Sequence, residues 1–158
     1  MADDATAHNS KKSAKIIQTK PSANASNVYA YYRDIIIEKS KVYTIAFWAK
    51  LDQNEGNEKE IDISIQTLSG IPQRVYLRTI MLNNTDWKEY IYTFISPKDI
   101  QGNSWIGLLV GLSDVDFWFD DIRFFEGEPP DEITGEKTGI CLSSKFVSTW
   151  ASIKKINK

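Results

Sequence analysis

Hydrophobic and polar residues alternate with a period of two along most of this chain. The clearest case is Glu60-Ile-Asp-Ile-Ser-Ile-Gln66, in which three isoleucines are separated by polar residues. Residues 42–50 alternate in the same way and place Tyr43 and Phe47 on one face and Trp48 on the other. Successive side chains of a strand point to opposite faces, so both segments predict half-buried antiparallel strands.

Six further segments have the composition of strands, and turn-forming residues separate them. They are residues 13–19, 27–37, 73–82, 88–95, 105–112 and 116–125. Eight short strands with no helical stretch among them predict an all-β fold, a two-sheet antiparallel sandwich. After Phe125 the acidic, proline-bearing segment 126–132 predicts an extended linker. We therefore expect a polar leader at 1–10, a sandwich at 11–127, and a linker with an irregular, lysine-rich tail at 128–158.

Composition and charge exclude several classes of protein. The chain has 158 residues, enough for one domain with a hydrophobic core. Its net charge of -2 disfavours nucleic acid as the main partner, and no apolar run is long enough to cross a membrane. One cysteine, Cys141, cannot form an intramolecular disulfide, and one histidine, His8, disfavours zinc sites and histidine-dependent triads. The polar start lacks the apolar segment of a signal peptide.

Aromatic residues make up 12% of the chain, with 5 Trp and 7 Tyr. A surface that binds sugars places flat rings against sugar C–H bonds, beside groups that hydrogen-bond hydroxyls. Trp48 is the first candidate, because the alternation sends it to a polar face. Tyr29 and Tyr31 share one face of residues 27–37 with Arg33, and they form a second aromatic pair. A single groove lined by Trp48, Tyr29 and Tyr31 would support a sugar site most directly.

Polar partners for a sugar lie on the neighbouring predicted strands. Gln66 and Ser64 share the polar face of residues 60–66, and Trp105 opens a strand where it could form an aromatic rim. The next strand places three candidates on one face: Arg74, Tyr76 and Arg78. The same residues could also be ordinary surface or strand-edge residues, which is the competing interpretation of each.

The carboxylates do not predict a glycosidase. Such an enzyme needs two carboxyl groups about 5–5.5 Å or about 6.5–9.5 Å apart. Asp120 and Asp121 are adjacent, so a regular strand would point them to opposite faces, and Asp116 is about 13 Å along the strand from Asp120. We therefore expect no catalytic residues and no enzymatic activity by this chain alone.

Four segments in order resemble the carbohydrate-binding modules of the family 4/9 type, with relatives in families 16 and 22. They are Lys12-Ser-Ala-Lys-Ile16, Ser40-Lys-Val-Tyr-Thr-Ile-Ala-Phe-Trp-Ala-Lys50, Trp87-Lys-Glu-Tyr-Ile-Tyr-Thr-Phe94 and Phe117-Trp-Phe-Asp-Asp-Ile122. The resemblance covers residues 10–127 and implies a galactose-binding-like jelly roll. Such modules are non-catalytic and usually appended to secreted glycoside hydrolases, so the resemblance also implies an extracellular or cell-surface location.

The chain departs from the family pattern at two places. Ser40 stands where the family has glycine, which is unstrained only if that turn avoids positive φ. The opening strand of the relatives has no counterpart before Asp3, so we expect the first strand to be missing. The resemblance further implies a structural Ca²⁺ ion held by Asp120 or Asp121, although the missing strand would normally supply other ligands.

These observations predict a module that binds a β-linked polysaccharide or oligosaccharide by aromatic stacking and hydroxyl capture. A catalytic module in a longer precursor is the expected protein partner. Two alternatives stay open: a galactose-binding-like protein–protein interaction module, and a fragment of a glycoside hydrolase. An ordered tail over the Trp48 face would favour the first alternative, and activity of this chain on a chromogenic glycoside would favour the second.

Overall fold

The chain folds into two antiparallel β-sheets packed face to face, as the alternation predicts. The computed structural model describes residues 2–3, 13–52, 58–68, 73–129 and 154–155. Its strands are β1 (Ala2–Asp3), β2 (Ser13–Ile16), β3 (Val28–Arg33), β4 (Ile36–Ile37), β5 (Val42–Leu51), β6 (Lys59–Thr67), β7 (Arg74–Leu82), β8 (Lys88–Ile95), β9 (Ile100–Gln101), β10 (Ser104–Leu109), β11 (Phe117–Glu126) and β12 (Lys154–Lys155). No helix of these residues has the length and apolar character needed to span a membrane.

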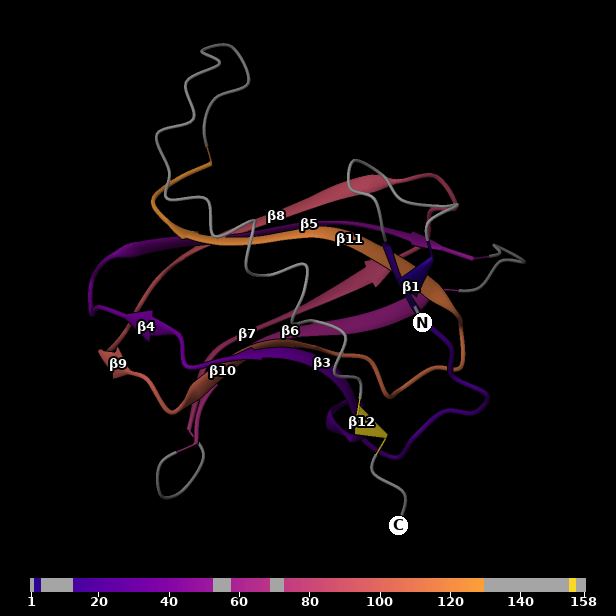
Figure 1. Ribbon diagram of the computed structural model, residues 1–158, viewed down its shortest axis with the longest axis horizontal. Coiled ribbons are helices and arrows are strands. Elements are labelled where there is room, and N and C mark those ends of the chain that lie inside the picture. The colour runs from indigo at the N-terminus through magenta and orange to yellow at the C-terminus, as the bar shows by residue number, and fades with distance from the viewer. Residues whose placement is uncertain (1, 4–12, 53–57, 69–72, 130–153, 156–158) are drawn as a thin grey trace.

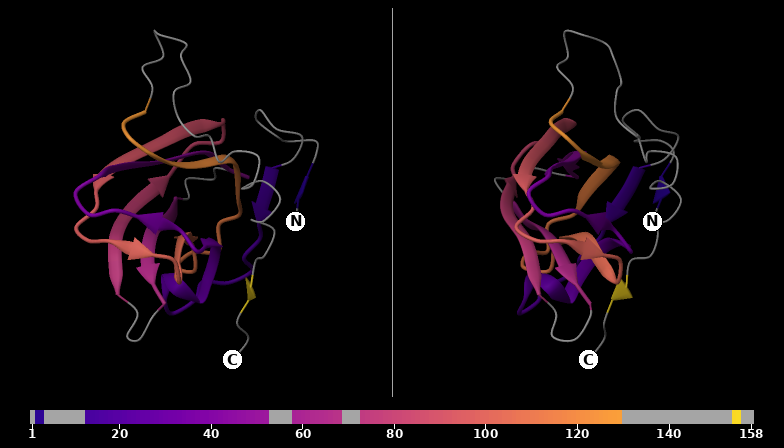
Figure 2. Two further views of the ribbon diagram at one scale, coloured as in Figure 1. Left: turned by 60° about the vertical axis from the view of Figure 1, so that its left-hand side comes forward. Right: turned by 90° about the vertical axis from the view of Figure 1, so that its left-hand side faces the viewer.

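The first sheet has the strand order β1-β2-β11-β5-β8, and the second has the order β12-β3-β10-β6-β7. They form the upper and lower layers in Figure 1, and the short pair β4–β9 lies at one end between them. Neighbouring strands come from distant parts of the sequence, as in the pairing of β11 with both β2 and β5. This crossing connectivity confirms the predicted jelly-roll sandwich. The turned views in Figure 2 show both layers curving around the space between them.

The hydrophobic core fills the space between the two sheets. It is built from the apolar positions of the alternating segments, including Ile61, Ile63 and Ile65 of β6 and Phe47 of β5, all fully buried. Apart from Lys59, which lies on the same side of β6 as the isoleucines, the polar positions of these strands point away from the core. The period of two in the sequence therefore decides which face of each sheet is available at the surface.

The predicted strand segments match the observed strands with small changes at their ends. Residues 27–37 divide into β3 and β4, and residues 13–19 shorten to β2. At the edge of the first sheet, the short strand β1 lies beside β2, and Ala2 of β1 pairs with Ala14 of β2. At the other sheet, β12 pairs with β3. The remainder of the predicted leader and tail, residues 4–12, 130–153 and 156–158, lies outside the described residues.

Two irregularities in the ladders change which way side chains point. In β11 the pairing with β5 passes from Asp120 to Arg123 while β5 advances by fewer residues, which marks a bulge. Asp121 within it has a φ of 48°. In β7, Tyr76 pairs with Ile65 whereas Arg74 pairs with Gln66, so Val75 is an extra residue. A bulge reverses the alternation beyond it, and this reversal decides where Arg74 lies.

Ser40 occupies the turn before β5 with a φ of 66°. The condition under which serine replaces glycine without strain is therefore not met. The Ser40 amide donates a hydrogen bond to the carbonyl of Ser96 at 2.8 Å, and the Ser96 amide donates to Lys41 at 3.0 Å. These two bonds fix the turn against the end of β8, so the chain keeps a conformation that an L-residue adopts at a cost.

Lys59 is a charged residue buried completely at the start of β6. Its Nζ donates hydrogen bonds to the Ser113 carbonyl at 2.5 Å and to Gln18 Oε1 at 3.2 Å. Burial lowers the pKa of Lys59 from its ordinary 10.5 to about 8, although the carboxylates of Asp114 and Asp116 act in the opposite direction. The protein thus keeps an ammonium group where desolvation disfavours it.

We predict that Ser40→Gly stabilises the fold. Glycine removes a left-handed penalty of about 1–2 kcal/mol but loses about 0.5–1 kcal/mol of backbone entropy. The free energy of unfolding in urea should therefore rise by about 0.5–1 kcal/mol. Ser40→Ala keeps the Cβ atom and is the matched control, and it should give no gain. Equal effects of the two substitutions would contradict this explanation.

We also predict a stability that rises with pH because of Lys59. Between pH 8 and 10.5 the unfolded lysine stays protonated while the folded one loses its proton, so the unfolded state binds more protons. Between about pH 7.5 and 9.5, the free energy of unfolding should rise by about 1–2 kcal/mol relative to Lys59→Met. Chemical unfolding of both proteins across this range measures the difference. A difference that stays constant with pH would show that Lys59 titrates normally.

Candidate functional site

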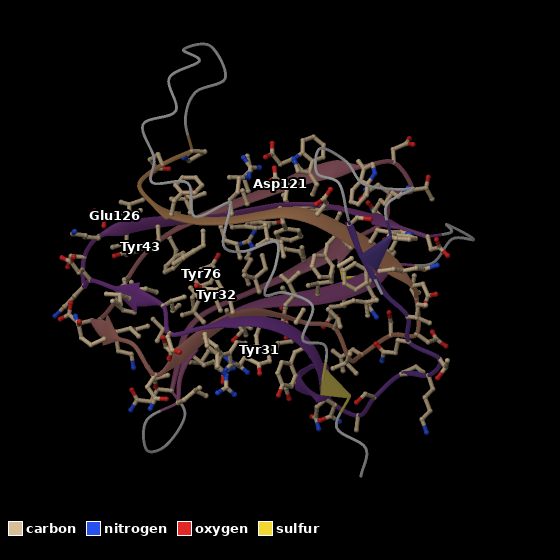
Figure 3. The ribbon with its side chains drawn as sticks, viewed as in Figure 1. Tyr31, Tyr32, Tyr43, Tyr76, Asp121 and Glu126 are labelled. Atoms are coloured by element: carbon tan, nitrogen blue, oxygen red, sulfur yellow. The ribbon has the colours of Figure 1, made fainter. Side chains whose placement is uncertain are left out.

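Three aromatic rings lie together on the outer face of the second sheet. Ala30 is fully buried in the core, so Tyr29 and Tyr31 on either side of it point outward. In Figure 3, Tyr31 lies on the side of β3 away from the first sheet, and Tyr32 lies between the sheets. The ring of Trp105 on β10 lies 6.1 Å from that of Tyr29 at an interplanar angle of 24°, and the two tyrosine rings are 5.3 Å apart. All three side chains are partly exposed, and we call them the aromatic cluster.

Gly107 makes room for the indole ring of this cluster. It lies in the middle of the sheet, paired with Tyr31 on β3 and with Ser64 on β6. A Cβ atom at position 107 would lie 2.9 Å from Cζ3 of Trp105 and 2.6 Å from the carbonyl oxygen of Ala30. Atoms of a real side chain do not approach that closely. The indole therefore covers the glycine and lies along the sheet surface instead of standing up from it.

A row of polar and aromatic residues crosses the sheet at the Trp105 end of the cluster. Residues that pair directly in antiparallel strands lie on the same face. Arg33 pairs with Trp105, Trp105 with Gln66, and Gln66 with Arg74, so these four residues run from β3 to β7. We call them the arginine row. It places two guanidinium groups at the ends and an indole and an amide between them.

The polar groups beside the rings are held in defined positions. The guanidinium carbon of Arg33 lies 5.2 Å from the centroid of the Tyr31 ring, a cation–π contact. Gln66 Nε2 donates a hydrogen bond to Ser64 Oγ at 3.0 Å, and Ser64 is completely buried beneath the surface residues. The amide oxygen of Gln66 and the guanidinium N–H groups of Arg33 are among the groups on this face that can hydrogen-bond sugar hydroxyls.

Trp48 lies on the other sheet, so one groove does not contain all three predicted rings. It points outward from β5 in the first sheet, where it pairs with Asp120 of β11 and Glu89 of β8. Glu89 Oε1 accepts a hydrogen bond from Arg123 Nη2 beside it. Strand alternation correctly sent Trp48 away from the core. It could not tell which sheet β5 joins, because sheet membership depends on pairing with distant segments.

Tyr76 and Arg78 are separated from Gln66 by the bulge in β7. Tyr76 pairs with Ile65 and Arg78 with Ile63, so both lie on the core side of the second sheet. The Tyr76 ring stacks on Phe94 of the first sheet at 4.3 Å, and in Figure 3 it lies between the layers. The Arg78 guanidinium lies 5.5 Å from the ring of Tyr92. Both residues therefore contact β8 of the first sheet. Arg74, on the other side of the bulge, points to the outer face with Gln66.

Asp120 and Asp121, the aspartates of the calcium prediction, each have a polar contact within β11. Asp120 is 4% exposed, and its Oδ1 accepts a hydrogen bond from the Asp121 amide at 2.7 Å. Asp121 Oδ2 lies 3.4 Å from Nε of Arg123, whose positive charge would repel a cation. Calcium takes six to eight oxygen ligands, and among the described residues no three carboxylate, imidazole or thiol side chains gather to hold a metal. Calcium binding stays a prediction that these residues do not support.

Trp105 is the residue whose importance the sequence understates. Its position at the start of a strand suggests an aromatic residue at the rim of a binding surface. In the structure, Trp105 lies on the central strand β10 between Arg33 of β3 and Gln66 of β6, and its ring contacts Tyr29. The signal that could have found it is the glycine two positions later. A glycine inside a strand often marks a close approach by another group, and here that group is the indole.

Partly exposed aromatic rings gathered on the outside of one sheet are typical of surfaces that bind ligands. The family model described as "Carbohydrate binding domain" (CBM_4_9) matches residues 1–104 of this chain. The chain therefore belongs to this family of carbohydrate-binding modules, as its motifs predict. No curated protein matches the chain.

Solved carbohydrate-binding modules share the fold. A CBM4 structure is 21% identical, covers 80% of this chain and 78% of its own, and superposes with a TM-score of 0.64. The N-terminal cellulose-binding domain of Cellulomonas fimi β-1,4-glucanase C is 12% identical, with coverages of 82% and 84% and a TM-score of 0.59. The CBM22-1 and GH10 modules of Clostridium thermocellum endo-1,4-β-D-xylanase 10B, complexed with xylohexaose, are 16% identical, with coverages of 80% and 24% and a TM-score of 0.57.

We predict that Gly107→Ala displaces the Trp105 ring and destabilises the sheet. The new methyl group would collide with both the indole and the backbone carbonyl of Ala30, which cannot move freely. Overpacking of this kind costs about 1–3 kcal/mol. Urea unfolding should show this loss, and adding Trp105→Ala to Gly107→Ala should restore only part of it, because the carbonyl contact remains. Full tolerance of Gly107→Ala would show that the indole does not lie over this position.

Proposed function

We propose that the chain binds a β-linked polysaccharide or oligosaccharide along the outer face of its second sheet. The rings of the aromatic cluster would contact the C–H faces of the sugars, while Arg33 and Gln66 would hydrogen-bond their hydroxyls. In this mechanism the chain breaks no bond. The observation that carries the proposal is the gathering of Tyr29, Tyr31 and Trp105 on one outer face, in a chain whose family binds carbohydrate.

The arrangement of the rings suits a ligand that lies flat on the sheet. The rings of Trp105 and Tyr29 have an interplanar angle of 24° and centroids 6.1 Å apart. In our proposal each ring contacts one of two successive sugars of an extended chain. Each aromatic contact contributes about 0.5–1.5 kcal/mol. Two or three contacts with a few hydrogen bonds correspond to dissociation constants of about mM to μM. This range is useful for a module that must release and rebind along a polymer.

The biological setting belongs to the same proposal. The structural relatives include a module that is joined to a GH10 module in a xylanase and a cellulose-binding domain of a glucanase. By analogy, the chain would hold a catalytic module of a longer precursor close to its polysaccharide, outside the cell or at its surface. This part of the proposal rests on the family and on the xylanase module.

We predict that Trp105→Ala and Tyr31→Ala each weaken binding by about tenfold or more. Both substitutions remove a ring from an exposed surface, so the fold should survive. Affinity gel electrophoresis against xylan, β-glucan, mannan and cellulose derivatives measures the retardation, and circular dichroism checks that each variant is folded.

Trp48→Ala is the matched control, because it removes an indole from the outer face of the opposite sheet. It should leave retardation unchanged. Retardation that is lost with Trp48→Ala and kept with Trp105→Ala would move the site to the first sheet. Folded protein that is retarded by no polysaccharide would contradict the proposed function.

A further inference from the structure

The two arginines of the arginine row have no acidic partner in the part of the chain that the structure describes. Among the described residues, neither the Arg33 nor the Arg74 guanidinium takes part in an ion pair or a hydrogen bond. Both side chains are exposed, and the contact of Arg33 with the Tyr31 ring does not use its N–H donors. Residues 69–72, which come shortly before Arg74 in the sequence, include no Asp or Glu. Two sets of charged donors are therefore available on the face that carries the rings.

The positive charge of this row does not follow from the charge of the whole chain, which has a net charge of -2. The two acidic residues of β6 on the same face, Asp62 and Glu60, lie along the strand away from the row. Every second residue of β6 lies on this face, so Asp62 is two such positions from Gln66 and Glu60 is three. Two positions on one face correspond to about 13 Å along the strand. This distance is beyond the screening length of about 8 Å at physiological salt.

The spacing of the arginines matches a ligand that runs across the sheet. They are separated by three strand spacings, about 14 Å in total, with Trp105 and Gln66 between them. A chain of sugars that stacks on Trp105 would thus pass both guanidinium groups. The planar guanidinium fork binds carboxylates with two parallel hydrogen bonds, a geometry that a single sugar hydroxyl does not offer.

We propose that this face selects acidic polysaccharides, whose uronic-acid carboxylates are bound by Arg33 and Arg74 at the two ends of the row. The inference rests on the proposed function, because it names the class of glycan that the same face prefers. The rings provide binding common to neutral and acidic chains. The arginines provide the discrimination between them.

The test compares polysaccharides that differ only in their carboxyl groups. Glucuronoxylan, which has a β-linked backbone, is used in native form and after reduction of its carboxyl groups to alcohols, with a neutral β-glucan alongside. Affinity electrophoresis and titration calorimetry should show tighter binding to a native polymer than to its reduced form. This preference should shrink severalfold as salt rises from about 20 mM to about 500 mM, because salt screens exposed charges.

Arginine variants locate the preference on the face. Arg74→Gln should weaken binding to the native polymer by about tenfold and leave binding to the reduced polymer unchanged. Arg33→Gln should weaken binding to the native polymer by about tenfold and binding to the reduced polymer by less, because Arg33 also donates hydrogen bonds to hydroxyls. Arg78→Gln is the matched control, since Arg78 is an exposed arginine of the same strand as Arg74 but lies on the core side over Tyr92. An equal loss with Arg78→Gln would overturn the assignment to the row.

The outcomes separate this inference from the proposed function. Equal binding of native and reduced polymers would overturn the acidic preference and leave carbohydrate binding intact. Tighter binding to a sulfated glycan of matched charge would overturn the assignment to carboxylates. Folded protein that binds none of these polymers, including the β-glucan, would overturn both.

Discussion

The pairing of β10 with β3 on one side and β6 on the other is the constraint on which the candidate site depends. β10 places Trp105 and Gly107 between the tyrosines of β3 and the amide of β6. If β10 paired with other strands, the indole of Trp105 would contact different side chains. A side chain at position 107 would then not meet the carbonyl oxygen of Ala30. The site is therefore a property of three strands that are far apart in the sequence and adjacent in the sheet.

The sequence predicts the strands and their inward faces because both follow from local alternation. Ile61, Ile63 and Ile65 are buried as expected, and Tyr29 and Tyr31 emerge on one outer face beside Arg33. The expected jelly roll is also observed. These features need only the period of two and a hydrophobic core, both of which can be read along the chain.

What the sequence could not predict depends on long-range pairing and on irregular ladders. Trp48 faces outward as predicted but on the opposite sheet, because nothing local specifies the neighbours of β5. The extra residue Val75 reverses the alternation in β7, so Tyr76 turns toward the core while Arg74 turns outward. A bulge is a single inserted residue, and the alternation of a short strand does not reveal it.

The two outer faces differ in how their charges are used, and this difference separates stability from binding. On the first sheet, Arg123 contacts Glu89 and Asp121, and Lys15 binds Asp52 at 2.7 Å, which lowers the pKa of Asp52 together with a hydrogen bond from Trp118. Charges that already have partners have little left to offer a ligand. On the second sheet, the guanidinium groups of Arg33 and Arg74 have no such partners among the described residues, and partly exposed rings lie beside them. A ligand that supplies both carboxylates and flat sugar faces would satisfy both kinds of group at once. The selectivity that we propose thus depends on groups that the described part of the fold leaves unpaired.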